Sequence, residues 1–277
     1  MNIHHVFQLI NTPDTLQRIA TVLQHHQTAL IQLAVAGRIA DTTDRDNILR
    51  YFRDKQLPTR PTTIEEVMKN FASSALSYSV VRRSLGTHIG AIPTASSIAK
   101  ALAAEFSDAR FLDDAYWKPS AMKTLALDVA GKRGLTNAML GEKTLHSRIL
   151  GVLHDGAQQI AIASKNGLDA YYAAIEQQVS SPEKAWQMLE QFTKNKIRQV
   201  GPTLAMDFMK NIGFHMFVKP DVHFLQQLPT LTGLGTKFSP RDSFILGWWL
   251  ASALKTPAFV LDHTLYQWGR HGGRSAC

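Results

Sequence analysis

Apolar residues recur at helical spacing along nearly the whole chain, and this pattern predicts an all-α protein. Leu16, Ile19 and Leu23 lie on one face of a helix that we expect to run from Asp14, as its cap, to about Ala36. No stretch shows the apolar–polar alternation of a β-strand, and no internal repeat is present. The chain is therefore expected to be helical throughout.

Prolines, glycines and serines separate the other expected helices. Thr43 or Asp44 is the expected cap of a short helix to about Arg53, and residues 56–63, with two prolines within four positions, form the clearest linker. Residues 230–237 lack the full spacing of a phosphate loop and follow no strand, so we interpret them as a helix–helix connection. The remaining helices are expected near residues 63–85, 94–106, 118–132, 145–165, 168–179, 182–194, 202–212, 220–228, 240–255 and 257–270.

Length and composition predict a globular protein inside the cell. With 277 residues and 45% hydrophobic content, the chain can form one large domain or two lobes with a full core. The longest apolar run, residues 244–254, is about half the ~20 residues of a membrane span, and residues 1–14 do not resemble a signal peptide. The lone Cys277 excludes an internal disulfide and a four-cysteine iron–sulfur cluster. We expect a soluble monomer of the cytoplasm or nucleoid, with no membrane association.

The basic charge is concentrated in two stretches of the chain. The formal net charge is +8 and the pI is about 9.6, which suits a polyanionic partner. Residues 118–148 hold six Lys or Arg against two Asp or Glu, and residues 194–277 hold ten against four. Nucleic acid is one interpretation of this distribution, and a solvated basic face is the other.

The second basic stretch contains a tight turn between two helices. Val200 and Gly201 form the turn, and Pro202 opens the next helix, a position where its missing N–H costs nothing. Gly201 is expected to allow a sharp turn and a close approach to another surface. The exposed N–H groups at the helix start would bind an anion such as a DNA phosphate, helped by Lys194 and Lys196, although such turns also occur as plain connections.

An acid follows this turn at a fixed distance. Asp221 lies at the expected start of a new helix, 18 residues after Thr203, within the segment Pro220-Asp-Val-His223. An aspartate in such a position is usually only a helix cap. An acid that returns to the neighbourhood of a phosphate-binding hairpin would instead be placed for chemistry on DNA.

These motifs resemble the helix-hairpin-helix (HhH-GPD) DNA glycosylase superfamily over roughly residues 194–270. Residues Ile197-Arg-Gln-Val-Gly-Pro-Thr-Leu-Ala205 match the hairpin of the family, and residues 220–223 match its Val-Asp-Thr-His block with the essential aspartate. Residues 261–270 are similar to the helix that precedes the iron–sulfur loop in some members. The resemblance implies a two-lobed fold, with a barrel lobe at 62–212, a second lobe at 1–61 and 213–277, and the active site between them.

The departures from the family pattern refine the expected activity. Gln199 replaces the first hairpin glycine, the cluster cysteines are absent, and Thr203 stands where bifunctional members carry a lysine that attacks the sugar. The resemblance therefore implies a monofunctional glycosylase that flips out a base, hydrolyses its N-glycosidic bond and leaves an abasic site. Repair of damaged bases and defence against modified phage DNA both remain open.

The resemblance also assigns roles to individual residues. Asp221 would be catalytic, no cofactor is expected beyond a possible monovalent cation at the hairpin, and the partner would be double-stranded DNA. Asp262 is expected to cap or pair within the last helix, and His223 to support the local turn. The expected DNA-binding residues are Gln199, Val200, Gly201, Thr203, Lys196, Arg198, Lys132 and Arg133, and the expected base pocket contains Thr203, Tyr116 and Trp117.

Three alternatives to a monofunctional glycosylase remain. A bifunctional glycosylase with lyase activity would need Lys210 or Lys219 to replace the missing lysine. A non-catalytic helix-hairpin-helix protein would bind DNA without cleaving the bond to the base. An all-helical protein-interaction module would leave the charge distribution unexplained.

Overall fold

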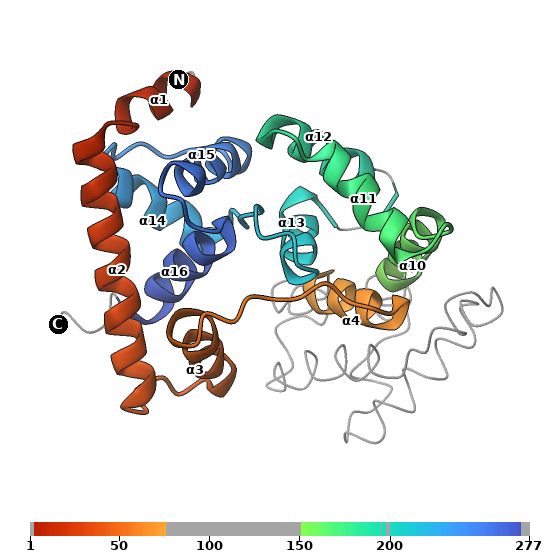
Figure 1. The fold of residues 1–277 in the computed structure, drawn as a ribbon, viewed down its shortest axis with the longest axis horizontal. Helices are drawn as coiled ribbons and strands as arrows, with labels where there is room; N and C mark the ends of the chain where they lie inside the picture. The colour runs from red at the N-terminus through yellow and green to blue at the C-terminus, as the bar shows by residue number, and fades with distance from the viewer. Residues whose placement is uncertain (1–2, 76–150, 195, 198–199, 273–277) are drawn as a thin grey trace, which may run out of the picture. The chain divides into compact units, whose positions relative to one another are not determined.

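A computed structural model describes residues 3–75, 151–194, 196–197 and 200–272, and helices are the only regular secondary structure within these ranges (Figure 1). The prediction of an all-α chain is confirmed for this part; the helices expected near 94–106 and 118–132 lie outside it. The chain divides into two compact units, residues 1–59 with 209–277 (unit 1) and residues 60–208 (unit 2). Each unit is described separately.

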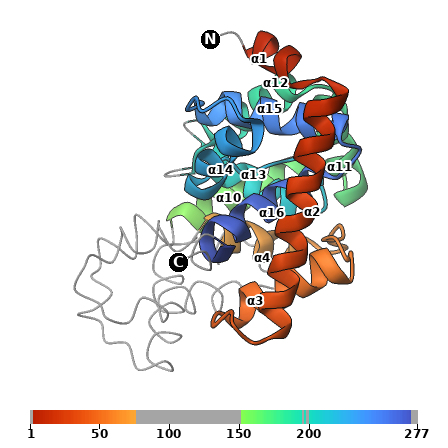
Figure 2. The same ribbon diagram turned by 90° about the vertical axis from the view of Figure 1, so that its left-hand side faces the viewer.

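Unit 1 is organised around a long N-terminal helix and the C-terminal helices. Helix α16 packs against α2, α14 and α15, as the two views in Figures 1 and 2 show. The core contains five phenylalanines with at most 1% of their surface exposed: Phe214, Phe217, Phe224, Phe244 and Phe259. Its helices are α1 (Ile3–Ile10), α2 (Pro13–Val35), α3 (Thr42–Ile48), the π-helical turn η1 (Leu49–Arg53), α14 (Val222–Thr232), α15 (Pro240–Ala253) and α16 (Ala258–His271).

Unit 2 is held together by an aromatic contact between its first and last helices. The rings of Phe71 and Phe208 meet edge to face at 5.5 Å, and a side chain at Gly156 would clash with the Phe71 ring. Glycine at position 156 therefore lets α10 approach α4 closely. The described helices are α4 (Ile64–Ala75), α10 (Gly151–Ala163), α11 (Leu168–Gln178), α12 (Pro182–Thr193) and the first seven residues of α13 (Pro202–Asn211).

Three helices begin with a serine or threonine followed by proline. The hydroxyl groups of Thr12, Ser181 and Ser239 each cap a helix by accepting a hydrogen bond from the backbone N–H three residues later. Proline occupies the first helical position because its fixed φ suits a helix start. The prediction that Asp14 caps α2 is therefore wrong: Thr12 is the cap, and Asp14 lies in the first turn.

The cap of α3 also differs from the prediction. Asp41, and neither Thr43 nor Asp44, accepts the capping hydrogen bond, from the N–H of Asp44 at 3.1 Å. The Asp44 carboxylate is instead buried and pairs with Arg270 at 2.7 Å. Asp44, which the local pattern predicted as a possible cap, thus forms a long-range ion pair with Arg270.

Helix α14 continues beyond its predicted end at residue 228. Pro229 lies inside the helix, which ends at Gly233 in the left-handed conformation with φ +76°. Arg18 in α2 donates a hydrogen bond to the carbonyl oxygen of Thr232 at 3.1 Å. This distant donor satisfies a carbonyl at the C-terminal end of the helix.

No single described helix is long and apolar enough to cross a membrane. Helices α15 and α16 meet the length and composition criteria only as a pair, and that pair is bent by 116°.

Candidate functional site

The predicted hairpin connects α12 to α13 in unit 2. Helix α12 ends at Thr193, whose carbonyl oxygen accepts hydrogen bonds from the N–H groups of Lys196 and Ile197 at 3.2 and 3.3 Å. Ile197 is 3% exposed and Val200 6% exposed, so both side chains pack inward. These apolar anchors hold the turn, while the side chains of Lys194 and Lys196 are exposed to solvent.

Gly201 is exposed at the start of α13, and neither its backbone conformation nor the space around it requires a glycine. Its φ lies outside the left-handed region, and a Cβ atom would have no described atom within 4 Å. The expectation that Gly201 allows a sharp turn stays a prediction, because residues 198 and 199 lie outside the described residues. The space in front of its backbone is open, and the close approach of another molecule to this backbone also stays a prediction.

The first turn of α13 places Thr203 beside Gly201. The carbonyl oxygen of Gly201 accepts hydrogen bonds from the N–H groups of Leu204 and Ala205, both at 3.1 Å. The N–H of Gly201 has no acceptor among the described residues. Thr203 is half-buried at the second position of the helix. The helix start thus combines a free backbone donor with the positive end of the helix dipole.

Asp221 lies in unit 1 and caps α14. Its Oδ1 accepts hydrogen bonds from the N–H groups of His223 and Phe224, both at 3.0 Å. Its own N–H donates to the carbonyl oxygen of Lys219 at 2.7 Å. The carboxylate is half-buried, and Oδ2 accepts no hydrogen bond from the described residues. One oxygen of the carboxylate is thus held by the fold, and the other is available.

A buried ion pair connects the end of α13 to α16 beside this segment. Lys210 Nζ lies 2.6 Å from Asp262 Oδ2, and the two side chains are 8% and 2% exposed. Asp262 Oδ1 accepts a hydrogen bond from the N–H of Lys219 at 3.1 Å. The expectation that Asp262 caps or pairs within its own helix is wrong, because its partners lie 52 and 43 residues away.

The charges of this cluster influence one another. Burial raises the pKa of Asp262 to about 6 against the opposing effect of the Lys210 ammonium group, and the negative charge of Asp221 adds to the rise. Burial also raises the pKa of Tyr266, and Asp221 contributes to that rise as well. Asp221 therefore lies within electrostatic range of both side chains. The structure brings Asp221 together with Asp262, which sequence reasoning did not place in the site.

His223 packs against α16 on the other side of Asp221. Its ring meets Tyr266 edge to face at 5.5 Å, and its Nδ1 is buried without a hydrogen-bond partner among the described residues. The hydroxyl of Tyr266 accepts a hydrogen bond from Arg270 at 2.9 Å. The backbone N–H of His223 donates a hydrogen bond to Asp221, and the His223 ring packs against α16, as expected of a residue that supports the local turn.

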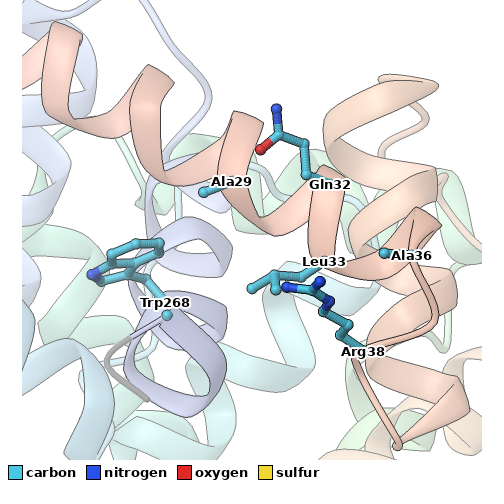
Figure 3. Close-up of a pocket in the computed structure, with 7 residues that line it drawn as sticks. Ala29, Gln32, Leu33, Ala36, Arg38 and Trp268 are labelled. Atoms are coloured by element: carbon cyan, nitrogen blue, oxygen red, sulfur yellow. The ribbon is translucent and has the colours of Figure 1, made fainter. Parts of the chain in front are cut away.

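A pocket of about 340 Å³ lies between α2 and α16 of unit 1 (Figure 3). Trp268 and Leu33 contribute apolar surface, and the Arg38 side chain extends beside Leu33. None of the sequence-predicted site residues lines this pocket. Trp268 faces it, whereas the neighbouring Gly269 packs against His223, so the pocket and Asp221 lie on different faces of α16.

Several predicted site residues lie outside the described residues. They are the base-pocket candidates Tyr116 and Trp117 and the DNA-binding candidates Lys132, Arg133, Arg198 and Gln199. Their roles stay predictions. Among the residues that the structure does describe, no group of three or more His, Cys, Asp or Glu side chains is placed to hold a metal ion.

No known protein family, curated protein or solved structure matches this chain significantly.

Proposed function

We propose that this chain is a monofunctional DNA glycosylase of the two-lobed helix-hairpin-helix type. It would flip a damaged or modified base out of the duplex, hydrolyse its N-glycosidic bond and leave an abasic site. The observation that carries the proposal is the state of Asp221. Its Oδ1 is fixed by two backbone N–H groups, while Oδ2 accepts no hydrogen bond from the described residues. Asp221 also lies 18 residues after the hairpin position Thr203.

The chemistry of base excision requires a carboxylate of this kind. As the base leaves, the sugar acquires oxocarbenium character, which a nearby negative charge stabilises. The same carboxylate positions or deprotonates the attacking water. Two backbone hydrogen bonds to one oxygen keep Asp221 in a fixed orientation, so the free oxygen needs no reorganisation when the positive charge develops.

The hairpin supplies the grip on DNA in this proposal. Ile197 and Val200 anchor the turn, so the exposed Gly201 backbone and the start of α13 present a rigid surface to a phosphate. Lys194 and Lys196, both exposed, add positive charge. Phosphate contacts carry no sequence information, so selectivity for a base would come from the pocket into which it flips.

The side chains near the site favour hydrolysis over lyase chemistry. Thr203 stands at the position of the lysine nucleophile in bifunctional relatives and cannot form an imine. Lys210, one of the two possible replacements, is 7% exposed and pairs with Asp262 at 2.6 Å. Burial and this ion pair make its amine a poor nucleophile.

A non-catalytic DNA-binding protein is the second candidate. The capping hydrogen bonds from His223 and Phe224 explain an aspartate at position 221 without any chemistry. Asp221→Asn separates the two possibilities, because asparagine caps helices as well as aspartate but carries no charge. Asp41→Asn, the same change at the cap of α3, is the matched control.

The test is a base-release assay on a panel of duplexes. The panel holds oxidised guanine, alkylated purines, mismatched pyrimidines and phage DNA with hypermodified bases. Abasic sites are cleaved with alkali, and released bases are identified by mass spectrometry. The wild type and Asp41→Asn should release a base, and Asp221→Asn should lose at least about 100-fold in rate. Release by Asp221→Asn at the wild-type rate, or no release from any duplex, would overturn the proposal.

A further inference from the structure

We propose that Asp262 is a positioning residue for Asp221, and that Lys210 holds the Asp262 carboxylate in place for this purpose. This inference rests on the proposed function. Asp262 accepts hydrogen bonds from two partners in unit 1, the Lys210 ammonium group near the end of α13 and the Lys219 backbone before α14. Neither the Asp262 nor the Lys210 side chain is exposed enough to meet a substrate.

A short series of hydrogen bonds connects the buried pair to Asp221. Asp262 Oδ1 accepts from the N–H of Lys219 at 3.1 Å, and the carbonyl oxygen of Lys219 accepts from the N–H of Asp221 at 2.7 Å. The backbone of Lys219 is therefore held at both its N–H group and its carbonyl oxygen. Because Asp221 lies only two residues beyond Lys219, a shift of this backbone moves the Asp221 carboxylate directly.

Stability alone does not account for an ion pair at this place. Replacement of a buried ion pair by apolar side chains is often neutral or stabilising, because desolvation offsets the attraction between the charges. An apolar residue at position 262, however, offers no acceptor to the Lys219 N–H. The pair thus supplies what packing cannot, a fixed acceptor for the backbone before Asp221.

The geometry also explains why both members of the pair are needed. Asp262 alone would be a buried charge without a counter-ion, and it would take up a proton or turn toward water. Lys210 donates to Oδ2 and leaves Oδ1 directed at Lys219. Lys210 therefore acts through Asp262, and Asp262 acts through the backbone of Lys219.

Amide hydrogen exchange of the full chain tests the positioning role without any substrate. Asp262→Asn removes the carboxylate that accepts from Lys210 and Lys219, so we expect faster exchange in residues 219–225. The double variant Asp262→Asn/Lys210→Gln restores an uncharged pair, in which asparagine Oδ1 accepts from Lys219 and the two amides bond to each other. Protection of residues 219–225 should return in the double variant.

Asp44→Asn is the matched control for the loss of a buried ion pair in the same unit. Asp44 is 6% exposed and pairs with Arg270 and His271 of α16, but no bond connects it to Lys219. This variant should lower the unfolding temperature yet accelerate exchange in residues 219–225 much less than Asp262→Asn does. Equal acceleration there in Asp44→Asn and Asp262→Asn would show that the pair only stabilises the unit, and would overturn the proposal.

Single-turnover base release supplies the second readout. Asp262→Asn should slow release by about 10- to 100-fold, as misplaced catalytic groups do, while the dissociation constant for the duplex stays at the wild-type value. The double variant should recover most of the rate. Wild-type rates in Asp262→Asn together with unchanged exchange would refute the positioning role. If wild-type protein releases no base, the glycosylase proposal fails, and the exchange comparison still decides the role of Asp262.

Discussion

The imidazole ring of His223 packs directly on the backbone of Gly269. A methyl group at position 269 would lie 2.9 Å from His223 Nδ1 and 3.0 Å from its Cβ atom. The His223 Cβ atom is attached to a backbone whose N–H is bound to Asp221, so it cannot move aside without breaking this hydrogen bond. Glycine at this point lets α16 support the start of α14.

Gly269→Ala should therefore destabilise the protein. Overpacking costs roughly 1–3 kcal/mol, and alanine in a helix interior gains roughly 1 kcal/mol over glycine, so the free energy of unfolding should fall by about 1 kcal/mol. Urea denaturation measures this difference. A variant as stable as wild type, or more stable, would show that His223 can relax away from α16.

Gly201→Ala should behave in the opposite manner. An added methyl group meets no described atom, so the free energy of unfolding should change by no more than about 1 kcal/mol, the usual effect of losing a glycine cap. If a phosphate approaches this backbone, however, duplex affinity should fall by about fivefold or more, a loss of roughly 1 kcal/mol. Fluorescence anisotropy with a labelled duplex at fixed salt measures the affinity. Unchanged affinity would remove Gly201 from the interface.

Protein stability should depend on pH through Asp262. Its pKa is raised from 3.8 to about 6, so the folded state holds a proton that the unfolded state releases. The stabilisation from this proton is complete below pH 4 and is lost as the pH rises through about 6. The groups that face Asp262 are the Lys210 ammonium group, the Asp221 carboxylate and the Lys219 N–H.

Urea denaturation at pH 4, 5, 6 and 7 measures this dependence. The reference is Asp262→Asn/Lys210→Gln, which carries no charge at either position. Relative to this reference, the wild type should lose unfolding free energy between pH 4 and 6 and then reach a plateau. A constant difference across the whole range would mean that Asp262 stays ionised in the folded protein at pH 4.

Thr203→Lys should add lyase activity to the proposed glycosylase. The substitution places an amine where bifunctional members of the resembling family carry one, and the half-buried position favours the neutral form. We expect strand cleavage without alkali and a covalent complex after borohydride treatment, while wild-type protein gives neither. Strand cleavage by the wild type would instead assign lyase activity to one of its own lysines.

Local patterns predicted most of the described helices, although not α1 (Ile3–Ile10), and placed their ends less well. Helices α11 and α12 begin at the predicted residues because Gly167 and Ser181-Pro182 interrupt the chain there. The cap of α2 was placed at Asp14, although Pro13 marks Thr12 as the residue before the helix. A serine or threonine followed by proline thus marks the start of a helix in this sequence.

The long-range features of the candidate site were not accessible to such patterns. The pairing of Lys210 with Asp262 joins residues 52 positions apart, and the Arg18 hydrogen bond to the end of α14 spans 214 positions. No local spacing reports contacts of this kind, because they depend on how helices pack. Asp221 could be predicted as a site residue from the sequence because its motif lies at a fixed distance from the hairpin.

The cap formed by Asp221 also bears on how the proposed activity can be lost. Asparagine forms the same two hydrogen bonds, and a single-nucleotide change converts an aspartate codon to an asparagine codon. Such a mutant would be folded, abundant and able to occupy its DNA site without acting on it. In a cell it would compete with the intact enzyme, and in the laboratory it would trap the uncleaved complex for crystallisation.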